Sequence, residues 1–326
     1  MSSDPVIVEV VRAGFVESVH RARVVVVGPD ATVQYEAGAV GRRMYPRSAN
    51  KPMQVVGMLG LGLDVTGDLL ALSGASHAGE AIHVDGVRRM LEAAGLDESA
   101  LQNTPDMPMD AAAAAAWAAA GHGPSSLTQN CSGKHAAMLT TAVRAGLDIA
   151  TYRDPQHPVQ VACREAIGEL SGEVPQDVAV DGCGAPLWSL TLAGMARAFG
   201  RLAAAADGPA KAVADAYRAH PEMVSGTRHR ERELHAAIPG LVCKGGAEAC
   251  QGIGLPDGTG IAIKIADGGA RAIPAIAAAV LQRLGHEHPT LTEHRRMPVL
   301  GHGDRVGEIR LAELPLCVRA SQRAHG

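Results

Sequence analysis

Hydrophobic and polar residues follow strand-like patterns at both ends of the chain. The N-terminal segments VIVEVVRAG, VESVHRARVVVVG and ATVQYEAG are rich in β-branched residues and are divided by turns that contain glycine. We therefore expect residues 6–36 to form an antiparallel meander of two or three strands. TGIAIKIADGG and PVLGHGDRVGEIRLAEL show strand patterns near the C-terminus, the latter with a turn at residues 302–304. Strands at both ends predict one sheet that the two termini complete.

The middle of the chain has the spacing of apolar positions that is typical of helices. The first helix is expected at residues 52–63, and another follows Thr66, a favourable N-terminal capping residue. Residues 79–120 are expected to be largely helical, and so is a segment at residues 273–284. Further helices are expected at residues 134–146, 158–171, 187–205, 209–219 and 229–236.

Together these elements predict an α+β fold in a single catalytic domain, residues 1–326. Residues 1–65 and 240–326 would supply the sheet region, and residues 66–239 a mainly helical region inserted between them. Neither an internal repeat nor a long linker divides the chain. With 47% hydrophobic residues, it can bury a sizeable core.

Composition excludes several classes of function. Aromatic residues make up 2% of the chain and the net charge is −4 without a basic stripe, so we expect no nucleic-acid partner. No apolar run approaches the roughly 20 residues of a membrane span, and the N-terminus lacks the pattern of a secretory signal. We therefore expect a cytoplasmic protein whose six cysteines are reduced.

Lysine is rare in this sequence, which makes each one informative. Of 30 basic residues only five are lysines, and four of them lie in segments rich in Gly, Ser or Cys: Lys51, Lys134, Lys244 and Lys264. A buried lysine can lose its proton and act as a base or a metal ligand, which arginine effectively cannot. These four are therefore candidates for function, whereas Lys211, in an alanine-rich stretch, is interpreted as a surface residue.

The segment RSANKP, residues 47–52, contains the only Ser-x-x-Lys of the chain, at an expected helix start. One helical turn puts the Ser48 hydroxyl and the Lys51 amine on the same face, so a neutral lysine could take the proton of an attacking serine. That role requires burial or nearby cations to lower the lysine pKa from about 10.4. The alternative is a serine that caps the helix beside a solvated lysine.

Two more segments could complete such a site. Ser76 lies in SGASHAGE, where small residues permit the close approach of a ligand, although a polar turn between helices would look the same. Lys264 alternates with Ile263 and Ile265 in a strand-like segment. Its side chain should therefore point away from theirs, either into a site or into solvent.

Cysteines in two separate segments could bind a metal. Cys131 lies in NCSGKH and Cys183 in DGCGAP, and the two could converge on zinc with Lys134 or His135 as a further ligand. Two buried free thiols that bind no metal would give the same sequence pattern. The SGK tripeptide lacks the upstream glycines of a phosphate-binding loop, so a nucleotide is not expected.

Taken in chain order, these segments resemble the zinc-containing, serine-lysine L-asparaginase family often called the rhizobial type. The resemblance rests on GFVESVHRARVVVV, RSANKPMQ, ASHAGE, QNCSGKHAAML, YRDPQHPVQ, VDGCGAPLWSL, HPEMVSGT, KGGAEA and GIAIKIADGGARA. It implies a fold similar to that of serine β-lactamases and glutaminases, one zinc ion per chain and a homodimer.

The resemblance also assigns residues to a site. It implies two catalytic serine-lysine pairs, Ser48 with Lys51 and Ser76 with Lys264. The zinc ligands that it implies are Cys131, Lys134 and Cys183. The residues that it assigns to substrate binding are Arg47, His135 and Asp181.

The expected reaction is hydrolysis of L-asparagine to L-aspartate and ammonia through an acyl-enzyme, with Ser48 attacking and Lys51 as its base. The sequence does not decide which of Ser48 and Ser76 attacks. The strings Ser-Asp-Asn and Lys-Thr-Gly of β-lactam-binding enzymes are absent, so a β-lactam substrate is not expected. Two alternatives stay open: a zinc-dependent amidohydrolase acting on another small amide, and a non-enzymatic amino-acid-binding sensor.

Overall fold

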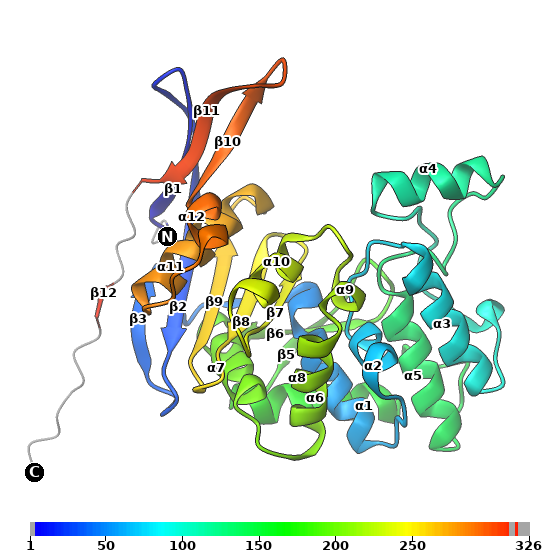
Figure 1. Ribbon diagram of the computed structural model, residues 1–326. Coiled ribbons are helices and arrows are strands. Elements are labelled where there is room, and N and C mark those ends of the chain that lie inside the picture. Colours follow the sequence, from blue (N-terminus) through cyan, green and yellow to red (C-terminus); the bar gives the residue numbers. More distant parts are fainter. Residues whose placement is uncertain (1–3, 313–316, 319–326) are drawn as a thin grey trace, which may run out of the picture.

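One large antiparallel sheet is formed by both ends of the chain in a computed structural model, which describes residues 4–312 and 317–318 (Figure 1). The N-terminal strands are β1 (Val6–Arg12), β2 (Phe15–Val27) and β3 (Val33–Ala37). The C-terminal strands are β7 (Val242–Gly246), β8 (Cys250–Gly254), β9 (Gly260–Ile265), β10 (Arg296–Gly301), β11 (Asp304–Leu311) and β12 (Cys317–Val318). The strand order is β10-β11-β1-β2-β9-β8-β7, and β3 pairs with β2 and β12. The prediction of a sheet completed by the two termini is confirmed.

The second half of β2 explains how this sheet separates two cores. Residues 24–27 are four valines, each at most 1% exposed. Alternate valines belong to different cores, one shared with the helical middle of the chain and one with the C-terminal helices. Because side chains alternate along a strand, a continuous apolar run fits a strand that is covered on both faces.

Helices cover both faces of the sheet (Figure 1). On one side lie α1 (Lys51–Gly60), α2 (Gly67–Ser73), α3 (Ala81–Ala93), α4 (Ala111–Ala119), α5 (Ser132–Arg144), α6 (Pro158–Ser171), α7 (Leu192–Ala203), α8 (Gly208–Ala219) and α9 (Pro221–Val224). Three further helices contribute to the other core: α10 (Arg230–Ala237), α11 (Ile273–Arg283) and α12 (Pro289–Arg295). Helix α7 packs directly on β8 and β9. Gly252 permits this contact, because a Cβ there would lie 2.0 Å from the Phe199 ring.

One helix prediction is wrong in part. The segment 187–205 is a strand followed by a helix, β6 (Pro186–Thr191) and α7. β6 lies between β4 (Arg43–Met44) and β5 (Gln176–Val180) in a second sheet, of three strands among the residues described. The apolar run LWSL fits a helix face as well as a strand. Pairing with strands that are distant in the sequence decides in favour of the strand.

The other helix predictions agree with the structure to within a few residues, apart from residues 79–120. There α3 and α4 are separated by a loop that contains the short helix η2 (Glu98–Ala100). The predicted α+β class is confirmed. Among the described residues, no helix is long and apolar enough to cross a membrane.

Candidate active site

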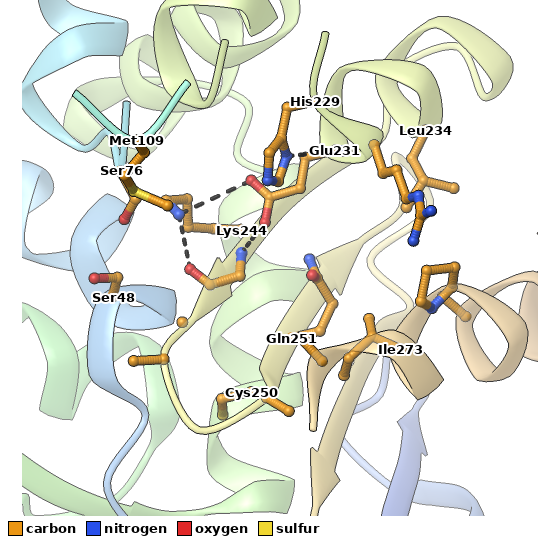
Figure 2. A pocket seen from close by; sticks show the side chains of 18 of the residues that line it. Ser48, Ser76, Met109, His229, Glu231, Leu234, Lys244, Cys250, Gln251 and Ile273 are labelled. Carbon is orange, nitrogen blue, oxygen red and sulfur yellow. Dashed lines mark hydrogen bonds and ion pairs between the residues drawn. The ribbon is translucent and has the colours of Figure 1, made fainter. Parts of the chain in front are cut away.

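A cavity of about 580 Å³ beside the start of α1 contains both serines of the predicted site (Figure 2). Ser48 lies in the short helix η1 (Arg47–Asn50), directly before α1. Ser76 lies in the loop between α2 and α3, where its N–H donates to the Val224 carbonyl at 3.0 Å. Two serines from separate segments therefore line the same space.

Lys51, the first residue of α1, is 1% exposed, and its amine has three hydrogen-bond acceptors. Its Nζ lies 2.5 Å from the Ala75 carbonyl oxygen, 3.0 Å from Ser76 Oγ and 3.1 Å from Cys131 Sγ. The structure thus joins Lys51 by a hydrogen bond to Ser76, the serine from the other segment. Ser48 precedes this lysine by one helical turn and lines the cavity beside Ser76.

The surroundings of Lys51 favour its neutral form. Burial lowers the pKa of the ammonium, and the positive charges of Lys134 and Lys244 lower it further. Cys131 acts in the opposite direction, but the pKa of Lys51 stays below its ordinary value. A lysine amine with a lowered pKa can accept a proton near neutral pH.

Lys244 is the second lysine that lines this cavity. It lies on β7, is 2% exposed and shares the cavity wall with Ser48 and Ser76. Its Nζ is 3.9 Å from a carboxylate oxygen of Glu231 and donates to the Gly245 carbonyl at 2.7 Å. A dashed line marks the ion pair with Glu231 in Figure 2. Glu231 is itself 6% exposed and also accepts a hydrogen bond from the Gly245 N–H. The scarcity of lysine makes Lys244 a candidate for function without giving it a specific role, and no pattern in the sequence points to Glu231.

Lys264 differs from Lys244 in its place and not in its kind of hydrogen bond. It lies half-buried on β9, where its amine donates to the carbonyls of Ile265, at 2.6 Å, and of Glu248. It is not among the residues that line the cavity. The family resemblance implied a pair of Ser76 with Lys264. The structure instead places the Lys264 amine on the carbonyls of Ile265 and Glu248. The hydrogen bond to Ser76 comes from Lys51, and the other lysine of the cavity is Lys244.

In the string KGGAEA, the two glycines that follow Lys244 are the feature that could have pointed to this lysine, and the structure explains why they are there. Two glycines follow this lysine, and the second brings β7 against the backbone of η1. A Cβ at Gly246 would lie 2.5 Å from the Pro46 carbonyl oxygen and 3.0 Å from the Ser48 nitrogen. Glycine at this position therefore allows the strand that carries Lys244 to approach the segment that carries Ser48.

Cys131, Lys134 and Cys183 form a second buried cluster next to the serines. Each is at most 4% exposed, and Lys134 Nζ lies 3.3 Å from Cys183 Sγ. Cys131 directly precedes α5 and Lys134 lies in its first turn, whereas Cys183 follows β5. The hydrogen bond between Cys131 and Lys51 connects this cluster to the serine site.

Of the three groups in the cluster, only Cys183 has a lowered pKa. A hydrogen bond from Cys131 and the charge of Lys134 lower the pKa of Cys183 to about 4 against the effect of burial. The same bond and burial raise the pKa of Cys131 to about 12. Burial disfavours the Lys134 ammonium, but the two sulfurs raise its pKa overall. Two sulfurs and an amine are donors that zinc accepts, provided that Cys131 and Lys134 release their protons.

The rest of the structure offers no competing centre of the usual kind. Among the described residues, no group of three or more His, Cys, Asp or Glu side chains could hold a metal ion. Cys131, Lys134 and Cys183, the residues that the resemblance assigned to zinc, lie together in the structure.

The three residues assigned to substrate binding are divided between two environments. Arg47 Nε lies 2.7 Å from Asp181 Oδ1, which ties η1 to the loop that carries Cys183. His135 is fully buried, and its Nδ1 lies 2.7 Å from the Tyr152 hydroxyl. Neither the Arg47–Asp181 pair nor His135 lines the cavity that contains the serines.

Comparison with solved structures finds distant similarities. A β-lactamase from Mycobacterium bovis is 17% identical, with 80% of this chain and 94% of that chain covered and a TM-score of 0.43. Mglu in its native form is 14% identical, with 82% of this chain and 65% of that chain covered and a TM-score of 0.45. A Bacillus glutaminase is 14% identical, with 74% and 82% covered and a TM-score of 0.32.

The sequence comparisons are more specific. No curated protein matches the chain. The model of the L-asparaginase II family, however, matches residues 8–311, which include every residue that lines the cavity and the whole cysteine-lysine cluster. The chain belongs to the L-asparaginase II family.

Proposed function

We propose that the protein is an L-asparaginase that hydrolyses the side-chain amide of L-asparagine through an acyl-enzyme on Ser48. Membership of the family supports an amidohydrolase. The observation that carries the proposal is the buried amine of Lys51, hydrogen-bonded to Ser76 at 3.0 Å beside the cavity that contains Ser48. A buried amine of lowered pKa that is hydrogen-bonded to one serine and one helical turn from another is equipped for nucleophilic catalysis, which a sensor does not need.

In the proposed reaction, Lys51 takes the proton of Ser48 as the serine oxygen bonds to the amide carbon. Because Lys51 donates its hydrogen bond to Ser76, the proton then passes through Ser76 to the leaving nitrogen. The C–N bond breaks and ammonia leaves. Water adds to the ester with the same groups acting in reverse, and aspartate is released.

Lys244 takes the place that the resemblance gave to Lys264. Its positive charge helps to keep Lys51 neutral and suits the negative charge that develops on the carbonyl oxygen. The first N–H groups of a helical turn have no intrahelical acceptor, so the Ser48 N–H is available to the same oxygen. The end of β7 at Gly246 lies directly against this group.

The remaining polar groups are proposed to hold the substrate and a metal. Arg47 and Asp181 carry the charges that complement the α-carboxylate and the α-amino group of asparagine. Cys131, Lys134 and Cys183 would hold a zinc ion. When bound, zinc would supply a fixed positive charge that positions the substrate.

The first test is ammonia release from L-asparagine and L-glutamine by the wild type and by Ser48→Ala, with zinc quantified in the same samples. We expect turnover of asparagine that Ser48→Ala abolishes without a change in zinc content. No turnover by a folded, zinc-loaded wild type would overturn the proposal.

A second measurement decides which serine attacks. Mass spectrometry of the protein mixed with substrate should detect the acyl-enzyme in the wild type and in Ser76→Ala, where it forms slowly, but not in Ser48→Ala. The reverse result would assign the attack to Ser76.

A further inference from the structure

The cavity extends far beyond the two serines, and its distant part is apolar. Leu234 of α10 and Ile273, Pro274 and Ala277 of α11 line it, and we refer to these four residues as the apolar wall. Ile273 and Ala277 are one helical turn apart and so lie on the same face of α11. In Figure 2, Leu234 and Ile273 lie across the cavity from Ser48 and Ser76.

Two of the polar side chains that line the cavity have partners within the protein. His294 Nε2 lies 2.9 Å from Glu233 Oε2. Arg228 donates to both carboxylate oxygens of Asp110, at 2.7 Å each. Both interactions engage these groups within the protein, although Nδ1 of His294 has no hydrogen-bond partner among the described residues. The four residues of the wall itself offer a ligand only apolar contact.

L-Asparagine is too small to need this space. A cavity of about 580 Å³ lies in the range of roughly 300–1,000 Å³ that is typical of sites for drug-sized ligands, whereas asparagine has a four-carbon skeleton. The pair proposed to hold its charged groups, Arg47 and Asp181, does not line the cavity. Ser48 does line it, so with the aspartyl half held by this pair, as proposed above, the cavity is left for a substituent on the amide nitrogen.

We propose that the cavity accommodates an apolar group on the scissile nitrogen, so that the protein hydrolyses N-substituted side-chain amides of aspartate. The inference rests on the proposed acyl transfer at Ser48. The bond from Ser48 Oγ to the carbonyl carbon forms, the C–N bond breaks, and the nitrogen takes a proton from Ser76 and leaves as a primary amine. Water then cleaves the ester and aspartate is released, so the reaction needs no further reactant.

Two isosteric substrates test the chemical class. One is asparagine with an isobutyl group on its amide nitrogen, and the other carries a hydroxypropyl group in which a hydroxyl replaces one methyl. Aspartate is the common product and gives the rate for both. We expect kcat/KM to be about tenfold higher for the isobutyl amide, because the hydroxyl would lose water without finding a partner on the wall. Equal rates, or a preference for the hydroxypropyl amide, would overturn the inference.

A variant of the apolar wall tests the location. Ile273→Asn places a polar amide at the first residue of α11, and the preference for the isobutyl amide over the hydroxypropyl amide should fall about tenfold. Ile82→Asn is the matched control, because Ile82 lies 40% exposed on α3 and does not line the cavity. A preference that Ile273→Asn leaves intact would place the substituent elsewhere and contradict the assignment.

Turnover of L-asparagine separates this inference from the proposed function. A wild type that hydrolyses asparagine but neither substituted amide overturns the inference alone. A wild type that hydrolyses the isobutyl amide but not asparagine supports the inference and overturns the asparaginase proposal. Inactivity toward all three amides overturns both.

Discussion

The amine of Lys51 lies 3.1 Å from the sulfur of Cys131, which joins the proposed catalytic base to the proposed zinc ligands. A substitution of Cys131 would therefore disturb both functions at once. Cys183 is the better probe of the metal, because its sulfur contacts Lys134 and Cys131 and leaves the hydrogen bond between Lys51 and Ser76 in place.

We predict that Cys183→Ala loses bound zinc and raises the KM for L-asparagine by about tenfold or more, with a smaller fall in kcat. The reason is that zinc is proposed to position the substrate while the serines and Lys51 carry out the chemistry. Elemental analysis and steady-state kinetics on the same sample measure both effects. Cys163→Ala is the matched control, because this thiol is equally buried but bonds to the Gln54 carbonyl. A collapse of kcat at unchanged KM would contradict the positioning role.

Lys244→Met should move the acid limb of the pH profile of kcat/KM to higher pH. The Lys244 charge lowers the pKa of Lys51, so removing it lets that pKa rise. Because Lys51 acts as a neutral base, activity appears only as pH increases through its pKa. Lys264→Met should leave the limb in place, because Lys264 does not line the cavity and is not among the charges that shift the pKa of Lys51. A limb that moves in Lys264→Met alone would restore the pairing of Ser76 with Lys264.

The choice between these two lysines shows where inference from the sequence stops. Ser48 and Lys51 could be paired from the sequence because one helical turn separates them. Lys244 and Lys264 both lie in strand-like segments of the same C-terminal region, and either could face a site. The order of the strands decides, because β7 borders η1 while β9 lies between β8 and β2. Strand order depends on long-range pairing that no local pattern specifies.

The fold shows the same division between local and long-range information. β1, β2 and β3 were predictable because their alternation and turns are local signals. β6 was missed because its run of apolar residues suits either a strand or a helix, and its partners come from residues 43–44 and 176–180. The cysteine-lysine cluster was found through family resemblance, since the spacing of Cys131 and Cys183 does not by itself distinguish ligands from free thiols.

Asp181→Asn should raise the KM for L-asparagine by about tenfold or more while changing kcat less. Asp181 holds Arg47 at 2.7 Å and is the proposed partner of the substrate's α-amino group, so the neutral amide removes one charge from that contact. Asp64→Asn is the control, because Asp64 pairs with Arg144 at 3.0 Å on the surface and does not line the cavity. An unchanged KM in Asp181→Asn would remove this residue from substrate binding.

Gly246→Ala should impair catalysis without unfolding the sheet. The new Cβ would lie 2.5 Å from the Pro46 carbonyl oxygen and 3.0 Å from the Ser48 nitrogen, so η1 must move away from β7. Displacing the nucleophile and its neighbouring N–H by about 1 Å costs roughly 10²-fold in kcat, whereas overpacking of this kind costs only about 1–3 kcal/mol of stability. Gly41→Ala provides the control, because no atom lies within 4 Å of its Cβ position, and it should keep both kcat and Tm. A Gly246→Ala variant that folds normally and keeps the wild-type kcat would show that the contact between β7 and Ser48 does not position the nucleophile. Stabilisation of the oxyanion would then fall to Lys244 without the Ser48 N–H.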